Sequence, residues 1–305
     1  MPLDIERLVP LLMAAFAYGL VLVLTRKQAG PVRSYATLLV GAFAFSFALW
    51  HLHGDDVAAG QGGSACLPLW ALGGTGLCAA SFACGFLLRQ YRFGASLEAW
   101  SQPVPSEIAA TLADLAPRLN LKRTPEARLI PSDRPLACVA GLFRPRLYLS
   151  SWMEDNLGPE ELEGVLAHEL AHIAQRDNLI AFVATTLLGA AAWLPTNWLA
   201  WQNLFTEREL AADALAVAVT GKPVALARVL HRAACANTAP SGVACGLLKS
   251  ATAERRIRQL VALHKGGTGA AKEARQWSRI WKLTLLVPPG LAWLIFALPH
   301  LLELP

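Results

Sequence analysis

Four long apolar segments dominate the pattern of hydrophobic and polar positions along the chain. The hydrocarbon core of a bilayer is about 30 Å thick, and a helix of about 20 apolar residues crosses it. Segments of this kind are Leu8–Leu24, Tyr35–Leu52, Cys66–Leu88 and Ile280–Leu302. The first has no small-residue cleavage site, so we expect an uncleaved span. The pattern predicts a mainly α integral membrane protein with about four transmembrane helices, three in residues 1–88 and one in residues 280–305.

The segment between the third and fourth spans, residues 89–279, has the mixed pattern of a compact domain. Apolar residues recur at helical spacing at Ile108, Leu112, Leu115 and Leu119, which predicts an amphipathic helix. Short apolar runs bounded by turn residues predict strands at "ARLIP", "LACVAG" and "RLYLS". The strand at "RLYLS" has two interpretations, a scaffold strand or an edge strand that pairs with an extended substrate. We therefore expect an α+β domain here.

Charge and composition assign a membrane orientation to these elements. Of the 305 residues, 54% are hydrophobic and only 16% are charged, which is typical of membrane proteins. Lys and Arg follow the first and third spans and precede the fourth, whereas the loop between the second and third spans has none. The positive-inside rule then places both termini outside and residues 89–279 in the cytoplasm, at a bacterial-type inner membrane. This membrane-facing surface accounts for the net charge of +5, which gives no separate indication of direct nucleic-acid binding.

The clearest chemical signal is the stretch "HELAHIAQRD", which begins at His168. It follows a helix start, because Gly158 suits an N-cap and Pro159 suits the first turn. Residues four apart lie on one helix face, so His168 and His172 can bind one metal ion. Catalytic zinc is commonly held by two His and one carboxylate. Glu169 lies about 100° round the helix, where it could deprotonate a bound water. A helix face could also carry these residues without a metal, so the motif needs the support of a third ligand.

A candidate third ligand lies downstream in "TERELAADALAVAV". Glu209 and Asp213 are four residues apart and therefore share a helix face. A carboxylate ligand followed by an acid that hydrogen-bonds a zinc-bound histidine is a common arrangement in metal sites. Glu207 is a rival ligand, but no acid follows it at the same spacing. We therefore predict Glu209 as the third zinc ligand and Asp213 as its supporting acid. The alternative is a solvated helix start with acids in its first turn.

One further apolar segment, Leu179–Trp201, lies between these two motifs. Its 23 residues would reach about 35 Å as a helix, enough for one membrane crossing. A single crossing would separate Glu209 from His168 and His172, however. We therefore expect a helical hairpin near residues 179–201 with a turn at Leu194–Trp198. This hairpin would be buried among the spans or dip partway into the membrane, with the zinc close to the membrane surface.

Hydrolysis at a zinc site of this kind would also need a side chain that stabilises the developing oxyanion. His231 and Arg256 are candidates because both lie downstream on predicted helices. A surface or packing role is the alternative for each of them.

Three linked motifs resemble the BlaR/MecR-type membrane metallopeptidases, a gluzincin family. They are "PLACVAGLFRPRLYL", "ELEGVLAHELAHIAQRDNL" and "ERELAADALAV". The resemblance covers roughly residues 129–218 and is weaker in the spans. It implies a cytoplasmic gluzincin-like zinc peptidase domain. The roles that it implies are zinc binding by His168, His172 and Glu209, proton transfer by Glu169 and support of a ligand by Asp213.

The resemblance also implies an endopeptidase that acts on a cytoplasmic or membrane-adjacent protein. Family members that sense beta-lactams cleave a cytoplasmic transcriptional repressor, or themselves, after an external signal. We expect no external penicillin-binding sensor domain, because the chain ends three residues past the fourth predicted span. Expected partners are a protein substrate and the lipid bilayer, and the sequence leaves the oligomeric state open.

Two other functions stay open. One is a quality-control or processing protease like the HtpX or CAAX-processing families. Those families place two full spans between the zinc helix and the third ligand, whereas only a short hairpin fits here, which favours the first function. The other is a non-enzymatic membrane receptor or scaffold, and the intact Glu169 argues against it, since a purely structural zinc site needs no base.

Overall fold

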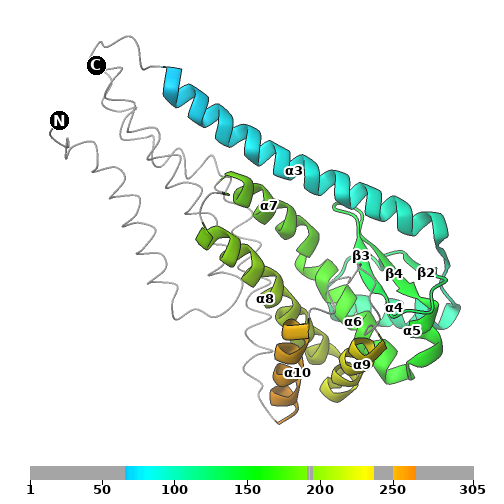
Figure 1. The fold of residues 1–305 in the computed structure, drawn as a ribbon. Helices are drawn as coiled ribbons and strands as arrows, with labels where there is room; N and C mark the ends of the chain where they lie inside the picture. Colours follow the sequence, from blue (N-terminus) through cyan, green and yellow to red (C-terminus); the bar gives the residue numbers. More distant parts are fainter. Residues whose placement is uncertain (1–65, 191, 193–194, 237–249, 266–305) are drawn as a thin grey trace.

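The computed structural model describes residues 66–190, 192, 195–236 and 250–265. This part of the chain is mainly helical and carries one small sheet (Figure 1). The elements in chain order are α3 (Cys66–Trp100), β1 (Gln102–Pro103), α4 (Ser106–Arg118), β2 (Ala127–Ile130), β3 (Ala137–Ala140), β4 (Arg146–Ser150), α5 (Ser151–Asn156), α6 (Pro159–Gln175), α7 (Asp177–Ala190), α8 (Pro195–Thr220), α9 (Pro223–Ala236) and α10 (Ser250–His264). The predicted mixture of helices with a few short strands is confirmed.

The amphipathic helix and the three strands predicted from the sequence are all present. Helix α4 buries Ile108, Leu112 and Leu115, and Leu119 is its buried C-cap. The predicted strands correspond to β2, β3 and β4. Strand β1 was not predicted, because its two residues, one of them Pro103, are too few to show an alternating pattern.

The four strands are arranged in the order β1-β2-β4-β3. Strands β2 and β4 pair in parallel, and the two flanking pairs are antiparallel. The edge-strand interpretation of "RLYLS" is wrong, because this segment is β4 and lies between β2 and β3. Its burial agrees with a central position, since Leu147, Tyr148 and Leu149 are all at most 2% exposed although their side chains alternate between the two faces. Strand β3 is the outer strand on this side.

Helices cover both faces of the sheet. On one face, Leu147 and Leu149 join the main core with buried residues of α4, α6, α8 and α9. On the other face, Tyr148 packs in a smaller cluster with Leu97 of α3. The Tyr148 hydroxyl donates a hydrogen bond of 2.8 Å to Glu98 Oε2. These contacts attach the C-terminal end of α3 to the sheet.

Helix α3 runs beside α7 before it reaches the sheet (Figure 1). The two helices approach closely at Gly189, where an added Cβ would lie 2.8 Å from Phe82 Cβ. The predicted third span, Cys66–Leu88, is found as the first part of α3. Among the described residues, however, no helix has both the length and the apolar character that a membrane crossing requires. The predicted spans Leu8–Leu24, Tyr35–Leu52 and Ile280–Leu302 lie outside the described residues.

The predicted helical hairpin is present as α7 and α8, which pack against each other. Its turn falls earlier than expected, because α7 ends at Ala190 and α8 begins at Pro195. Proline suits the first position of a helix, where its missing N–H is not needed, so Pro195 begins α8 instead of forming the turn. Helix α8 then continues to Thr220 and brings Glu209 and Asp213 back to α6.

Candidate metal centre

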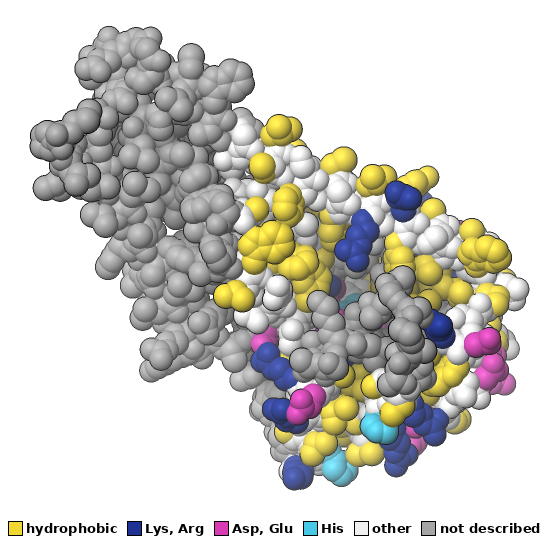
Figure 2. All heavy atoms as spheres, viewed as in Figure 1, with side chains coloured by type: hydrophobic (Ala, Val, Ile, Leu, Met, Phe, Trp, Pro, Cys, Tyr) yellow, Lys and Arg dark blue, Asp and Glu magenta, His cyan; other side chains and the backbone are white. Residues whose placement is uncertain are grey.

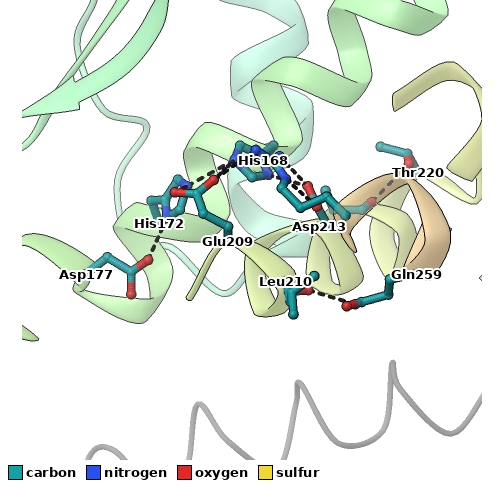
Figure 3. Close-up of polar contacts among 10 residues, drawn as sticks. His168, His172, Asp177, Glu209, Leu210, Asp213, Thr220 and Gln259 are labelled. Atoms are coloured by element: carbon teal, nitrogen blue, oxygen red, sulfur yellow. Dashed lines mark hydrogen bonds and ion pairs between the residues drawn. The ribbon is translucent and has the colours of Figure 1, made fainter. Parts of the chain in front are cut away.

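Helix α6 holds the two candidate histidine ligands in a buried position. It begins at Pro159 after the N-cap Gly158, whose backbone N–H donates to Glu161 Oε2 at 3.2 Å. The His168 side chain is 2% exposed and that of His172 is 14% exposed. Both rings lie on the face of α6 that meets α8 (Figure 3).

The end of α6 adds a residue to the site that sequence reasoning missed. No Gly or Pro marks the end of α6 in the sequence, but Arg176 adopts the left-handed conformation (φ 56°, ψ 42°) and forms the C-cap. Helix α7 starts at the next residue, Asp177, which is 2% exposed. Asp177 Oδ2 lies 2.5 Å from His172 Nδ1. The only hint in the sequence is an acid five residues after the second histidine, directly before an apolar segment.

Three candidate ligands from α6 and α8 converge (Figure 3). The Nε2 atoms of His168 and His172 are 3.0 Å apart. Glu209 places Oε2 at 3.5 Å from His168 Nε2 and Oε1 at 3.8 Å from His172 Nε2. One ligand atom from each residue lies within 4.8 Å of the others. Ligands about 2.0–2.1 Å from a tetrahedral zinc ion lie about 3.3 Å from one another, so the spacing fits zinc.

The positions of the carboxylates around the two histidines also fit a bound cation. His168 Nδ1 lies 2.9 Å from Asp213 Oδ1. In the same way, His172 Nδ1 lies 2.5 Å from Asp177 Oδ2. A carboxylate beside Nδ1 favours the tautomer with its proton there and leaves the lone pair on Nε2. Two such lone pairs 3.0 Å apart repel each other unless a proton or a metal ion lies beside both. Glu209 Oε2 is buried at the same place and accepts no hydrogen bond from the described residues.

Arg256 of α10 closes the other side of the cluster. Its guanidinium is fully buried and donates from Nε and Nη2 to the two oxygens of Asp213, at 2.7 Å each. Its Nη1 lies 3.0 Å from Glu209 Oε2, and its Nη2 lies 3.4 Å from His168 Nε2. The structure thus brings Arg256 to the candidate ligands, with most of its donors directed at protein carboxylates.

Burial and charge move the pKa values in this cluster in different directions. Burial and Arg256 lower the pKa of His168, but the nearby carboxylates of Asp213 and Glu209 outweigh them and raise it to about 9 in the absence of a metal ion. Burial would raise the pKa values of Glu209 and Asp213, yet the surrounding cations hold both below their ordinary values. Burial raises the pKa of Glu169, although the neighbouring histidines oppose this shift. Of the three carboxyl groups, Glu169 is therefore the one that takes up a proton most readily.

A pocket of about 360 Å³ opens beside His172. Its walls are the turn between β3 and β4, which includes Phe143, and the region where α6 meets α7. Asn178 of α7 donates hydrogen bonds of 3.3 and 2.9 Å to two backbone carbonyls of β3 and the turn, which fixes the turn against α7. Gly141 has φ 100°, and a Cβ there would lie 2.6 Å from a turn carbonyl. The pocket is therefore held open by a turn that requires glycine.

His231, the other candidate for oxyanion stabilisation, lies elsewhere. It is exposed on α9, and its Nε2 is 4.0 Å from Cys235 Sγ. It lines a separate surface hollow with Arg228 and Arg232, and none of the candidate ligands lines that hollow. The structure brings Arg256, but not His231, to the cluster.

Comparisons with known proteins give this site a context. The model of the family described as BlaR1 peptidase M56 matches residues 14–259, more than half of the chain. Parts of the chain are also similar to curated proteins named protease HtpX homolog. The relative from Persephonella marina is 37% identical over 111 residues, which cover 34% of this chain and 38% of the relative. The relative from Salinibacter ruber is 37% identical over 134 residues, which cover 41% and 49%. That from Acaryochloris marina is 32% identical over 158 residues, which cover 40% and 54%. The chain thus spans from about a third to about half of the length of these relatives.

Proposed function

The chain belongs to the BlaR1 peptidase M56 family, and we propose that it is a zinc-dependent endopeptidase that cleaves a protein at or near a membrane surface. The observation that carries this proposal is the convergence of His168, His172 and Glu209, whose ligand atoms lie within 4.8 Å of one another. The similarity of part of the chain to proteins named as proteases supports the same chemistry.

In this proposal His168 and His172 hold zinc through Nε2 and Glu209 holds it through a carboxylate oxygen. Bound zinc would supply Lewis-acid polarisation of a peptide carbonyl and of a water molecule. Glu169 accepts a proton from the attacking water and returns it to the leaving amine, a role that suits a buried carboxyl with a raised pKa. Asp213 keeps the ring of His168 oriented through its contact with Nδ1.

The pocket beside His172 offers a path for the substrate. Its wall includes Val139 of β3, the outer strand of the sheet among the described elements. An extended peptide that pairs with β3 would lie next to His172, because main-chain hydrogen bonds along a sheet edge hold a peptide in register. We therefore propose that β3, and not "RLYLS", pairs with the substrate.

The membrane location is part of the same proposal. From Asn178 to Thr206 the chain contains no Asp, Glu, Lys, Arg or His, although it lies directly between the candidate ligands. Trp198 and Leu199 on α8 are 40% and 60% exposed, and exposed Trp side chains suit a membrane interface. Figure 2 shows hydrophobic side chains over α3 and the neighbouring ends of α7 and α8. We propose that this end meets the membrane, with the predicted spans Leu8–Leu24, Tyr35–Leu52 and Ile280–Leu302 crossing it, both termini outside and the site on the cytoplasmic side.

Two physiological roles follow from the comparisons. Signal transduction through cleavage of a transcriptional repressor, or self-cleavage, is the role that the resemblance to BlaR/MecR-type peptidases implies, and the family match supports it only as far as a peptidase. The similarity to proteins named protease HtpX homolog fits the alternative role better, that of a quality-control or processing protease. The two roles differ in the number and the kind of substrates.

Quantitative proteomics of cells that carry the wild type or Glu169→Gln separates these roles. A single uncleaved repressor in the variant supports signalling, whereas accumulation of several membrane proteins supports quality control. An unchanged set of protein fragments would contradict the endopeptidase proposal and favour a non-enzymatic receptor or scaffold. Zinc content serves as the folding control, because Glu169→Gln leaves all three candidate ligands in place.

A further inference from the structure

Two Arg–Asp–His contact series converge on the candidate metal ligands. In the first, Arg256 contacts Asp213, which contacts Nδ1 of His168. In the second, Arg208 Nε lies 3.3 Å from Asp177 Oδ2, and the same oxygen lies 2.5 Å from His172 Nδ1. Each candidate histidine ligand is therefore backed by a buried carboxylate and a buried guanidinium. The proposed zinc binding and proton transfer assign no role to Arg208.

Arg256 and Arg208 differ in how many hydrogen bonds they make with their aspartates. Arg256 is bidentate on its carboxylate, with both hydrogen bonds at 2.7 Å. Arg208 is 8% exposed and its Nε lies 3.3 Å from Asp177 Oδ2, but its Nε and Nη1 make no hydrogen bond with the described residues. Asp177 Oδ1 is likewise buried without a hydrogen bond in the described part of the chain. The contact between Arg208 and Asp177 is therefore less tightly fixed by hydrogen bonds than the contact between Arg256 and Asp213.

A row of aromatic rings positions Arg208. The guanidinium carbon lies 5.2 Å from the centre of the Phe205 ring, within the range of a cation–π contact. The Phe205 ring packs on Trp201 at 4.7 Å, and Trp201 packs on Trp198 at 6.4 Å. Trp198 in turn meets Phe82 of α3 at 6.4 Å. We call Trp198, Trp201 and Phe205 the aromatic ladder, and it links α3 to Arg208 through continuous contacts.

We infer that Arg208 is a positioning residue that acts through Asp177 on His172 and ties the orientation of this ligand to the packing of α3 on the aromatic ladder. A buried carboxylate is stable as an anion only beside a cation or hydrogen-bond donors. The Asp177 carboxylate orients the His172 ring through its contact with Nδ1, so that Nε2 is the nitrogen that would bind the metal. A shift of the ladder that moves Arg208 changes this support. The inference rests on the proposed function in one respect, the assignment of His172 as a zinc ligand.

Zinc affinity tests this inference without any measurement of cleavage. The full-length protein is purified in detergent, and its zinc dissociation constant is measured by competition with a chromophoric chelator. Arg208→Leu and Asp177→Asn should each weaken affinity by about 10-fold or more. The double variant should bind as weakly as Asp177→Asn alone, because the arginine acts only through the aspartate.

Three further variants sharpen the test. Arg208→Lys keeps the charge and should recover part of the affinity. Phe205→Leu removes the ring beneath Arg208 and should give a smaller loss than Arg208→Leu. Arg228→Leu removes the same charge from an exposed position on α9 and should bind zinc like the wild type. If Arg208→Leu does not fold, Arg208→Lys and Phe205→Leu carry the comparison.

The outcomes are distinct. Wild-type affinity in the Arg208 and Phe205 variants would overturn the inference and leave the proposed function intact. Additive losses in the double variant would also overturn it, because Arg208 would then act by another route. A wild-type protein that binds no zinc would overturn the proposed function, and the inference with it.

Discussion

Replacing Arg256 with methionine tests how the buried charges of the site are balanced. Arg256 and Asp213 are both fully buried and share two hydrogen bonds of 2.7 Å. Glu209 adds a second carboxylate 3.0 Å from the guanidinium. Methionine would fill much of the space but would leave both carboxylates without this cation. Removing one partner of a buried ion pair typically costs about 3–5 kcal/mol, so we expect the free energy of unfolding of the metal-free protein to fall by this amount.

The neighbouring residue provides a matched control. The Arg255 side chain is 52% exposed and pairs with Glu207 at 2.7 Å. An exposed pair contributes about 0–1 kcal/mol, so Arg255→Met should have little effect. The two variants remove the same charge from adjacent positions of α10 and differ in burial.

The assay is denaturant unfolding in detergent with a chelator present, followed by tryptophan fluorescence. The double variant Arg256→Met/Asp213→Leu should regain much of the lost stability, because both partners are replaced by apolar side chains. It should still bind zinc poorly, since His168 loses its carboxylate partner. A loss in Arg256→Met no larger than that in Arg255→Met would refute the reasoning, as would a double variant less stable than the single one.

Three further predictions concern helix packing, the sheet and the ligands. Gly189→Ala should lower the melting temperature, because overpacking against α3 costs about 1–3 kcal/mol, whereas the higher helix propensity of alanine stabilises by only about 1 kcal/mol. Gly164→Ala is the control, because its added Cβ would meet its nearest neighbour at 3.7 Å. Tyr148→Phe should destabilise the protein near pH 7 and less in acid, because the tyrosine hydroxyl holds the pKa of Glu98 below its ordinary value. This contribution to stability is lost as pH falls through the lowered pKa of Glu98. Equal losses in unfolding free energy at pH 7 and pH 3 would contradict this prediction. Asp213→Asn should weaken zinc binding by about 10–100-fold without abolishing it; complete loss, measured by chelator competition, would make Asp213 a ligand.

Local patterns were enough to predict most elements of the described domain. The N-cap at Gly158 and the start of α6 at Pro159 follow from residues next to each other in the chain. The spacing of Glu209 and Asp213 likewise indicated one helix face, and α8 carries both. The hairpin was predicted from a chemical requirement, namely that Glu209 return to the helix that carries His168 and His172.

Features that depend on tertiary structure were not predicted. Asp177 reaches His172 because Arg176 takes a left-handed conformation, which an arginine does not signal in sequence. The order of strands in the sheet is likewise set by long-range pairing, so the central position of β4 was not visible in "RLYLS". Arg256 was chosen for its chemistry, but its bidentate contact with Asp213 depends on the docking of α10 against α8.

The most direct test of the proposed function measures zinc content and peptide cleavage in the same preparations of wild type, His172→Ala and Glu169→Gln. A proteome-derived peptide mixture serves as the substrate. We expect one zinc ion per chain and cleavage in the wild type, loss of zinc in His172→Ala, and full zinc without cleavage in Glu169→Gln. Full zinc in a His168→Ala/His172→Ala double variant, or undiminished cleavage by Glu169→Gln, would contradict the proposed zinc peptidase.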